Sequence, residues 1–274
     1  MKKLITILLE RNLVINRNTA ESLILEGKVR VDGKIKDKPG IKVSDKSIIE
    51  IKPDLPFVSR GGLKIQEAFT DLKISVKNKK AVDIGASTGG FTDFLLKNKA
   101  SSVIAIDVGY GVLSWKLRKD PRVIVLERTN IRDVIPDQLP YLSELTVVDV
   151  SFISIKTVFK NIFDITCEKG EIVLLIKPQF EVTKEEVENK GVIKSKILHL
   201  KVLLKIVEHI LKFEVEIKGL TFSKIKGRKG NMEYWLYVIK KTKKSSLNNK
   251  KTSLNYDKMI IDTVNNAYSY YCME

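Results

Sequence analysis

Short apolar runs alternate with segments of helical periodicity along most of the chain. The apolar runs are continuous, and they cover residues 81–84, 103–106, 123–126, 145–150 and 172–176. Continuous apolar strands are typical of a parallel sheet that is covered on both faces. The helical segments cover residues 90–98, 155–165 and 195–212. The alternation predicts an α/β domain, and two runs without a helix between them, 213–222 and 233–239, predict an antiparallel edge.

The first part of the chain has shorter elements with basic side chains on their polar faces. Helical periodicity covers residues 4–12 and 19–26, and residues 48–51 have the pattern of a strand. Between the second helical segment and this strand, Val29 and Val31 alternate with basic residues and lead into Asp32-Gly33, a strong signal for a tight hairpin. The sequence predicts a small α+β module over 1–54, a linker with Pro56 over 55–60, a main domain over 61–240 and a flexible, basic tail over 241–274.

Charge adds a candidate partner to this picture. The chain has 49 Lys and Arg against 33 Asp and Glu, for a formal net charge of +16. Such an excess favours an anionic polymer as partner, although a merely solvated basic surface is the alternative. The only two cysteines, Cys167 and Cys272, have no metal-ligand spacing, so no metal is expected. Glu10 and Arg11 interrupt the first apolar run, and no run reaches the ~18–20 residues of a membrane span, so we expect a cytoplasmic protein without stable membrane association.

A cofactor site is predicted where the run 81–84 enters a glycine-rich turn, Gly85-Ala-Ser-Thr-Gly89-Gly90. The glycine spacing differs from the dinucleotide fingerprint and argues against a pyrophosphate. Asp83 could accept hydrogen bonds from a cationic amino-acid group, and Asp107, at the end of the next run, from two ribose hydroxyls. S-adenosylmethionine carries both groups. The amide of Asn130, after the third run, could meet the adenine edge.

Four charged residues could surround the reacting atoms. Methyl transfer requires the nucleophile, the methyl carbon and the sulfur in line, and a hydroxyl nucleophile must lose its proton. Carboxyl ends of parallel strands share one edge of a sheet, which places Asp149 and Lys177 together beside the cofactor. Glu233 and Lys64 are the other two candidates. For each lysine a surface amine is the plain alternative, least so for Lys177, which ends an apolar run and precedes a proline.

The N-terminal module resembles the S4 RNA-binding domain. The resemblance lies in Asn16-Arg17-Asn18-Thr19-Ala20, Glu26-Gly27-Lys28-Val29, Val31-Asp32-Gly33 and Lys38-Pro39-Gly40, with Asn-Arg where Ser-Arg is usual. It implies that the second helix and the hairpin face RNA. The candidate RNA-binding residues are Arg11, Arg17, Lys28, Arg30 and, after the linker, Arg60.

The rest of the chain resembles the TlyA family, S4-domain proteins with an FtsJ-like, Rossmann-like methyltransferase domain that have also been labelled hemolysins. The matching segments are Val58-Ser-Arg-Gly-Gly-Leu-Lys64, Asp83-Ile-Gly-Ala-Ser-Thr-Gly-Gly-Phe-Thr, Glu127-Arg-Thr-Asn-Ile-Arg132, Val148-Asp149-Val-Ser-Phe-Ile, Leu175-Ile-Lys177-Pro-Gln-Phe-Glu181 and Gly230-Asn-Met-Glu233. Together with the S4 pattern they cover about residues 1–240 in order.

The resemblance implies ribose 2′-O-methylation of cytidine in ribosomal RNA, free or in a ribosomal subunit, through a Lys-Asp-Lys-Glu tetrad. Lys177 would accept the proton of the 2′-hydroxyl. Asp149 would hold it, Lys64 would favour its neutral amine as a like charge, and Glu233 would orient the pair. The family match also assigns Asn130 to adenine and Ser87, Thr88, Gly89 and Gly90 to the methionine end, with Asp83, Gly85, Asp107 and Asp149 completing the cofactor site.

Three other functions remain as alternatives. The chain could be an RNA-binding protein with an inactive methyltransferase fold, or a membrane-active cytolysin, which the absence of a spanning run opposes. A base methyltransferase would use a cysteine or an Asn/Asp-Pro-Pro-aromatic motif, and neither is found near the predicted site. We expect His199 and His209 to be packing or surface residues, and Trp115 and Trp235 to lie in the core.

Overall fold

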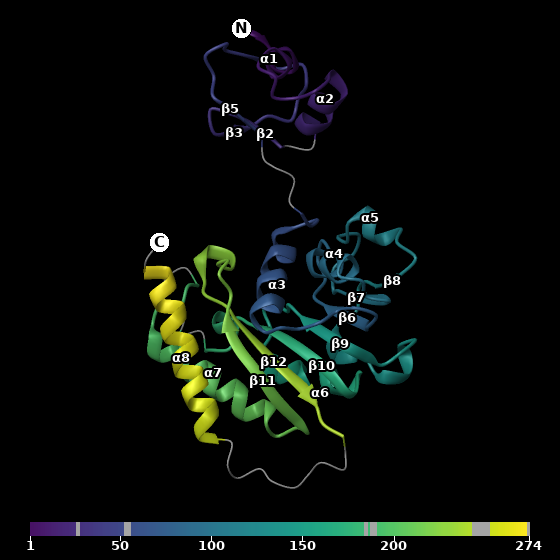
Figure 1. Ribbon diagram of the computed structural model, residues 1–274, viewed down its shortest axis with the longest axis vertical. Coiled ribbons are helices and arrows are strands. Elements are labelled where there is room, and N and C mark those ends of the chain that lie inside the picture. The colour runs from purple at the N-terminus through teal and green to yellow at the C-terminus, as the bar shows by residue number, and fades with distance from the viewer. Residues whose placement is uncertain (26–27, 52–55, 184–185, 187–190, 243–252, 273–274) are drawn as a thin grey trace. The chain divides into compact units, whose positions relative to one another are not determined.

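A computed structural model describes residues 1–25, 28–51, 56–183, 186, 191–242 and 253–272 (Figure 1). The chain divides between residues 55 and 56 into two compact units.

The N-terminal unit is the small α+β module that the sequence predicts. Its elements are β1 (Lys2–Lys3), α1 (Leu4–Glu10), α2 (Arg17–Leu25), β2 (Val29–Val31), β3 (Lys34–Ile35), β4 (Lys42–Val43) and β5 (Ile49–Ile51). β2 lies between β3 and β5 in an antiparallel sheet, and β1 pairs with β4. Asp32 and Gly33 join β2 to β3 with φ angles of 50° and 76°, the left-handed pair that a two-residue hairpin requires. Leu4, Leu8 and Ile24 are fully buried between the helices and the sheet.

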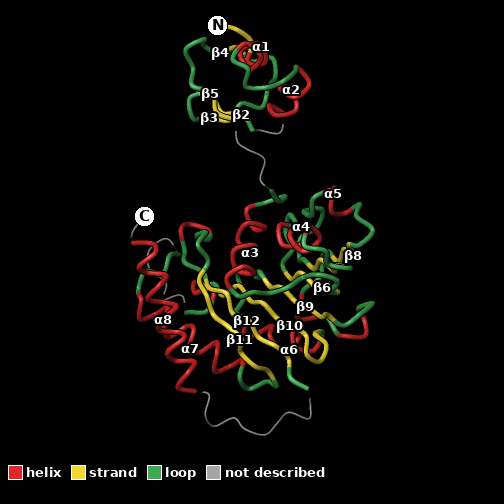
Figure 2. Tube along the Cα trace, in the orientation of Figure 1, coloured by secondary structure: helices red, strands yellow, loops and turns green. Residues whose placement is uncertain are grey.

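The second unit is built on a seven-stranded sheet in the order β11-β12-β10-β9-β6-β7-β8 (Figure 2). The strands are β6 (Lys80–Ile84), β7 (Ser102–Ile106), β8 (Val123–Leu126), β9 (Ser143–Val148), β10 (Thr166–Ile176), β11 (Val215–Phe222) and β12 (Tyr234–Lys240). The five strands from β10 to β8 are parallel, as predicted. The antiparallel strand is β12, which lies between β10 and β11. The prediction of an antiparallel edge from these two runs is confirmed, because β11 and β12 pair antiparallel at one edge of the sheet, with β12 beside β10 and β11 outermost.

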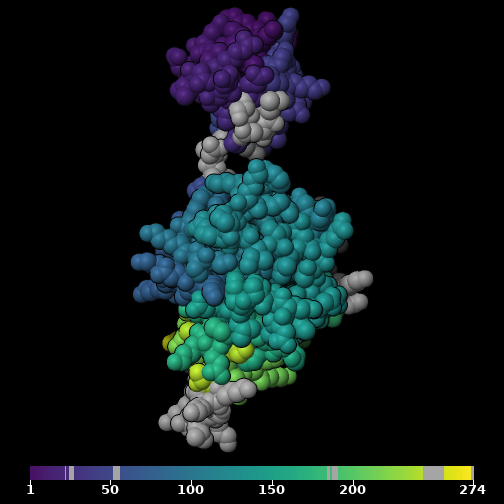
Figure 3. Space-filling model, turned by 90° about the vertical axis from the view of Figure 1, so that its right-hand side faces the viewer, coloured from purple at the N-terminus to yellow at the C-terminus, as the bar shows by residue number. Residues whose placement is uncertain are grey.

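Helices cover both faces of this sheet. On one face, α3 (Arg60–Asp71) and α4 (Gly90–Lys97) close a core around Ile65 and Leu95. On the other, α6 (Ile155–Asp164), α7 (Lys196–Ile210) and α8 (Ser253–Cys272) close a second core around Phe159. The short α5 (Trp115–Arg118) precedes β8. From the side of β7 and β8, the surface of this unit consists mainly of blue and teal residues, the first half of the unit (Figure 3).

The prediction of a flexible tail is wrong for residues 253–272, which form α8. Ile260, Val264 and Ala267 are fully buried, and their spacing of four and three places them on one stripe of the helix. This stripe packs on α7 and β11. The polar run before the helix hides it in the sequence, and residues 243–252 of that run lie outside the described residues.

The carboxyl ends of β6 and β9 mark the place where a ligand binds in a sheet of this kind. From β6 the chain continues to β7 and β8 on one side and then returns to β9 and β10 on the other. Such a reversal of strand order opens a crevice between the two central strands. The loops after β6 and β9 meet there, since the amide of Asp149 donates to the carbonyl of Ile84 at 2.8 Å.

Candidate active site

Two cavities lie at this reversal point and share Gly85, Ser87 and Asp149 in their walls. The first, of about 280 Å³, is lined by the start of α3, the turn after β6 and the loop before β12. The second, of about 460 Å³, is lined by the ends of β6 and β7 and by the loops after β8 and β9. A volume of ~300–1,000 Å³ is usual for small-molecule sites, so the pair forms one candidate site with two compartments.

Gly85 brings the turn after β6 against the loop after β9. Its φ of 82° lies in the left-handed region, which costs an L side chain about 1 kcal/mol or more. A Cβ at this position would also lie 2.4 Å from the carbonyl oxygen of Asp149. Glycine is therefore required here by both conformation and contact.

Most of the cofactor residues expected from the sequence line the two cavities. Gly85, Ser87 and Asp149 line both, Thr88 and Gly90 line the first, and Asp107 and Asn130 line the second. The Asp107 carboxylate accepts hydrogen bonds from the amides of Ser87 and Gly109, each at 2.7 Å. Asn130 accepts one from the amide of Arg132 at 3.1 Å. Both side chains thus hold the loops that form the second compartment.

Asp83 and Gly89 are not among the residues that line the two cavities. The Asp83 side chain is fully buried, and its Oδ2 accepts a hydrogen bond of 2.6 Å from the hydroxyl of Thr92 in α4. Burial raises the pKa of Asp83 to about 7, while the Thr92 hydroxyl acts in the opposite direction. Asp83 therefore ties β6 to α4 behind the glycine turn.

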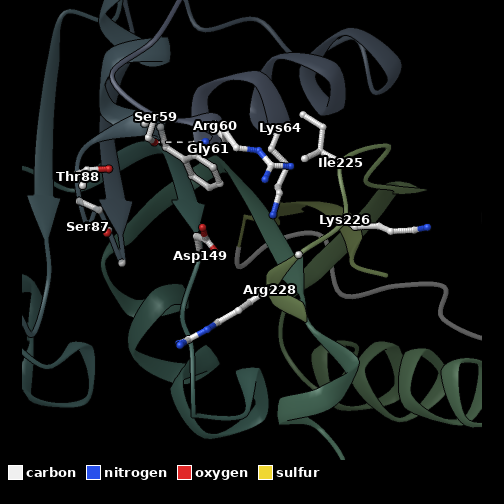
Figure 4. A pocket seen from close by; sticks show the side chains of 15 residues that line it. Ser59, Arg60, Gly61, Lys64, Ser87, Thr88, Asp149, Ile225, Lys226 and Arg228 are labelled. Carbon is white, nitrogen blue, oxygen red and sulfur yellow. Dashed lines mark hydrogen bonds between the residues drawn. The ribbon is translucent and has the colours of Figure 1, made fainter. Parts of the chain in front are cut away.

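Lys64 and Glu233 form a buried ion pair at the first cavity. Lys64 Nζ lies 2.7 Å from Glu233 Oε2, and the two side chains are 13% and 3% exposed. Ser59 begins α3 by accepting a hydrogen bond from the amide of Gly61 (Figure 4), and this helix presents Lys64. A Cβ on Gly227 would lie 1.9 Å from Glu233 Oε1, so the loop before β12 closes on the carboxylate. Burial raises the pKa of Glu233, and Lys64 opposes that shift.

Lys177 and Asp149 form a second ion pair at the ends of β10 and β9. Lys177 Nζ lies 2.6 Å from Asp149 Oδ1 and donates to the Ser151 hydroxyl at 2.7 Å. Lys177 is 9% exposed. Asp149 of this pair and Lys64 of the other pair line the same cavity (Figure 4). The structure therefore places the four residues predicted from distant parts of the sequence in two ion pairs at the first cavity.

Two family models match the chain: an FtsJ-like methyltransferase over residues 57–240 and an S4 domain over residues 2–49. A relative from Mycobacterium tuberculosis, named 16S/23S rRNA (cytidine-2'-O)-methyltransferase TlyA, is 40% identical over 237 residues, which are 86% of this chain and 88% of that protein. This chain belongs to the TlyA family.

Other TlyA relatives carry a different name. Hemolysin A from Brachyspira hyodysenteriae is 41% identical over 228 residues, which are 82% of this chain and 94% of that protein. A solved structure of a protein named as a hemolysin from Streptococcus thermophilus has a TM-score of 0.75 and 34% identity, and the match covers 99% of this chain and 97% of that one. The described part of this TlyA-family chain contains no helix that is both long and apolar enough to cross a membrane.

The candidate RNA-binding residues of this TlyA-family chain differ in their surroundings. Arg17, at the start of α2, is exposed, and Arg30 is half-buried on β2. Arg11 is engaged within the module, because its guanidinium donates to the carbonyls of Asp45 and Ser47. Lys28 is half-buried before β2, and exposed Arg60 lines the first cavity.

Sequence reasoning missed the loop between β11 and β12. Ile225, Lys226, Gly227 and Arg228 line the first cavity, and Figure 4 shows that Lys226 points away from it. The run Lys224-Ile-Lys-Gly-Arg-Lys-Gly230, basic and glycine-containing between two apolar strands, is the signal that could have found this wall. Phe152 was also missed, although it is 79% exposed beside Asp149 with a φ of 62°.

The expectations for the aromatic and histidine residues are met in part. Trp235 is fully buried, as predicted. Trp115 is 66% exposed, so the prediction that it lies in the core is wrong. It begins the four-residue α5, which is too short to bury both its apolar side chains, and Leu117 occupies the core instead. His199 is a packing residue, held between the Tyr234 hydroxyl at 2.7 Å and the carbonyl of Ile193 at 3.1 Å.

Proposed function

We propose that this chain transfers the methyl group of S-adenosylmethionine to the ribose 2′-hydroxyl of cytidine in ribosomal RNA. The observation that carries the proposal is the pairing of Lys177 with Asp149 and of Lys64 with Glu233 at one end of the crevice. The name of the Mycobacterium tuberculosis relative supports the substrate, and the matching S4 domain supports an RNA ligand.

The residues of the crevice fit S-adenosylmethionine. Gly85 lets the turn after β6 lie against the loop of Asp149, and both line the two compartments. Asp107 follows β7 with a carboxylate at the second compartment, where ribose hydroxyls could donate to it. Asn130 lies in the same wall, beside the apolar side chains of Ile106 and Ile131 that suit an adenine ring. Ser87 and Asp149 reach both compartments and suit the amino-acid end. When bound, the sulfonium supplies an electrophilic methyl group.

In the proposed reaction, Lys177 accepts the proton of the 2′-hydroxyl as the oxygen attacks. Asp149 and Ser151 hold Lys177 Nζ from two directions at 2.6 and 2.7 Å, which fixes the point where the proton arrives. Lys64 lines the same cavity as Asp149, and Glu233 keeps Lys64 in place at 2.7 Å. Each residue thereby has a defined part in deprotonation and alignment.

A methylation assay tests the proposal. Purified chain, labelled S-adenosylmethionine and ribosomal subunits or naked ribosomal RNA should give 2′-O-methylcytidine, located by mapping ribose methylation. If no form of the RNA acquires ribose methylation, the proposal is wrong. If the methyl groups are found on base atoms instead, the chain is a base methyltransferase.

The first prediction concerns Lys177→Ala. We expect methyl transfer to fall by at least 100-fold, because general base catalysis contributes ~10²–10⁴-fold, while S-adenosylmethionine and RNA still bind. Single-turnover kinetics measure the rate of methyl transfer, and equilibrium binding measures the affinities for S-adenosylmethionine and RNA. Lys160→Ala is the control, an exposed lysine on α6 that pairs with Asp164. Single-turnover activity retained by Lys177→Ala would remove this lysine from the role of base.

The hemolysin names of two relatives do not alter the proposal. A crevice with paired charges at the carboxyl ends of parallel strands suits group transfer. No observation on the described residues favours a lytic activity over it.

A further inference from the structure

Glu181 is a carboxylate near the active site that the proposed chemistry does not use. It follows β10 by five residues, after Lys177 and the short 3-10 turn Pro178–Phe180. Its Oε1 accepts a hydrogen bond of 2.7 Å from the amide of Ile155, and its Oε2 accepts one of 2.5 Å from the hydroxyl of Ser154. Both donors belong to the start of α6, which follows the loop of Asp149.

These bonds join the two chain segments that carry the second ion pair. Residues 149–154 leave β9 and residues 177–181 leave β10, and the Glu181 carboxylate connects their far ends. At the near ends, Lys177 contacts Asp149 and Ser151. The two segments are thus held together at both ends, with the lysine amine at one of them.

Asp149 and Lys177 each follow the last residue of their strand. β9 and β10 pair with each other as far as Val148 and Leu174, and β10 pairs with β12 as far as Ile176. The segments beyond these residues therefore depend on other contacts, and the Glu181 hydrogen bonds act as a clamp between them. The loop after Asp149 also contains Phe152 with a φ of 62°, a conformation that costs about 1 kcal/mol or more and persists only where the surroundings hold it. The hydrogen bonds from Ser154 and Ile155 to Glu181 fix the far end of this loop.

The start of α6 is a suitable place for this carboxylate. Helix N-termini present free amides and a partial positive charge, and both favour an anionic acceptor. Ser154 is also the N-cap of α6, where its hydroxyl accepts from the amide of Lys156 at 3.2 Å. The Ser154 hydroxyl therefore connects the Glu181 carboxylate to the first turn of the helix, because it donates to the one and accepts from the other.

We infer that Glu181 is a positioning residue, which fixes the loop of Asp149 against the turn of Lys177 and so sets where the lysine amine meets the substrate hydroxyl. The inference rests on the proposed function. A displacement of ~1 Å at a reacting group can cost ~10²-fold in rate, so a clamp of this kind acts on turnover.

Two substitutions separate position from charge. Glu181→Gln keeps the length of the side chain and an acceptor oxygen for the Ile155 amide, and its new amide can still bond to the Ser154 hydroxyl. Glu181→Asp keeps the charge but is one methylene shorter and cannot reach both donors from the same backbone position. We expect kcat within about threefold of the original for Glu181→Gln and at least 10-fold lower for Glu181→Asp.

The control is Glu186→Asp. Glu186 accepts from the amide of Thr183 at 3.1 Å and pairs with Lys201 at 2.6 Å, away from the loop of Asp149. Its shortening should leave kcat unchanged. If Glu181→Asp turns over as fast as the original chain, or if Glu181→Gln is as slow as Glu181→Asp, the positioning role is wrong.

A second measurement does not depend on the reaction. Amide hydrogen exchange of residues 150–154, followed without cofactor or RNA, should become at least 10-fold faster in Glu181→Asp and stay unchanged in Glu186→Asp. Unchanged exchange in Glu181→Asp would contradict the clamp. A chain that methylates no RNA but shows the faster exchange would contradict the proposed function and leave the clamp standing.

Discussion

At the scale of single residues, the sequence names candidate groups, and the structure shows which of them make contact. Each of the four proposed catalytic residues lies at a strand end or in a matching motif, and the structure joins them in two ion pairs, Lys64 with Glu233 and Lys177 with Asp149. Asp83 could be named as well, but its burial behind the turn could not be predicted. Whether a strand-end carboxylate faces a ligand or a neighbouring helix depends on packing between α4 and β6, which the sequence does not reveal.

Asp83 leads to a prediction about pH. Its pKa is about 7 in the folded chain, against 3.8 for an ordinary aspartate, so the folded state binds up to one more proton than the unfolded state between these two pH values. The protonated side chain stabilises the fold fully below pH 3.8, and this stabilisation is lost as the pH rises through 7. The difference between the two pKa values corresponds to about 4 kcal/mol.

Asp83→Asn should remove this contribution, because an amide does not titrate. We expect its free energy of unfolding to fall less steeply from pH 4 to pH 7 than that of the original chain, by up to about 1.4 kcal/mol per unit. Urea unfolding at several pH values measures both curves, and the other titrating groups cancel in the difference. If the free energies of unfolding of the two chains change with pH in parallel, Asp83 is ionised in the folded chain over the whole range from pH 4 to pH 7.

At the scale of elements, the strands follow directly from their apolar runs, whereas the place of β12 between β10 and β11 and the helix α8 do not. The position of β12 inside the sheet depends on pairing with both β10 and β11, a choice between neighbours that its own sequence does not encode. The apolar stripe of α8 has helical spacing, but the polar segment before it favours a tail. Tertiary contacts with α7 and β11 decide the outcome.

Two neighbouring isoleucines test the packing of α8. Ile260 is fully buried and Ile261 is 47% exposed. Ile260→Ala should lower the free energy of unfolding by about 2–5 kcal/mol, as removal of buried methyl groups does. Ile261→Ala should change it by less than about 0.5 kcal/mol. If the two substitutions have equal effects in chemical denaturation, α8 does not pack on α7 and β11 through Ile260.

At the scale of the whole molecule, the chain joins a small module with an S4 match to a methyltransferase domain, and the sequence predicts both. The boundary near residue 55 follows from Pro53 and Pro56, which interrupt regular structure. The formal charge of +16 suits a polyanionic substrate. The contribution of each module to RNA binding depends on which Lys and Arg side chains are exposed to the RNA phosphates. The sequence alone does not give this exposure.

Exposed Arg17 and half-buried Arg30 should contribute to RNA binding through the N-terminal unit. Replacing both by Gln should weaken binding and reduce the slope of log K against log salt by about 1–2, since each phosphate contact contributes ~0.7–0.9. The affinity for S-adenosylmethionine should not change. Lys218→Gln, an exposed lysine of β11 that pairs with Glu216, is the control. An unaltered slope in the double variant would place the RNA on other residues.

The contact between Gly85 and the Asp149 carbonyl has a consequence for how this enzyme can be altered. One methyl group added to the turn would push directly on the backbone that carries a proposed catalytic carboxylate. Donor affinity and turnover therefore cannot be tuned independently at this point, and any redesign of the turn must move the loop of Asp149 with it.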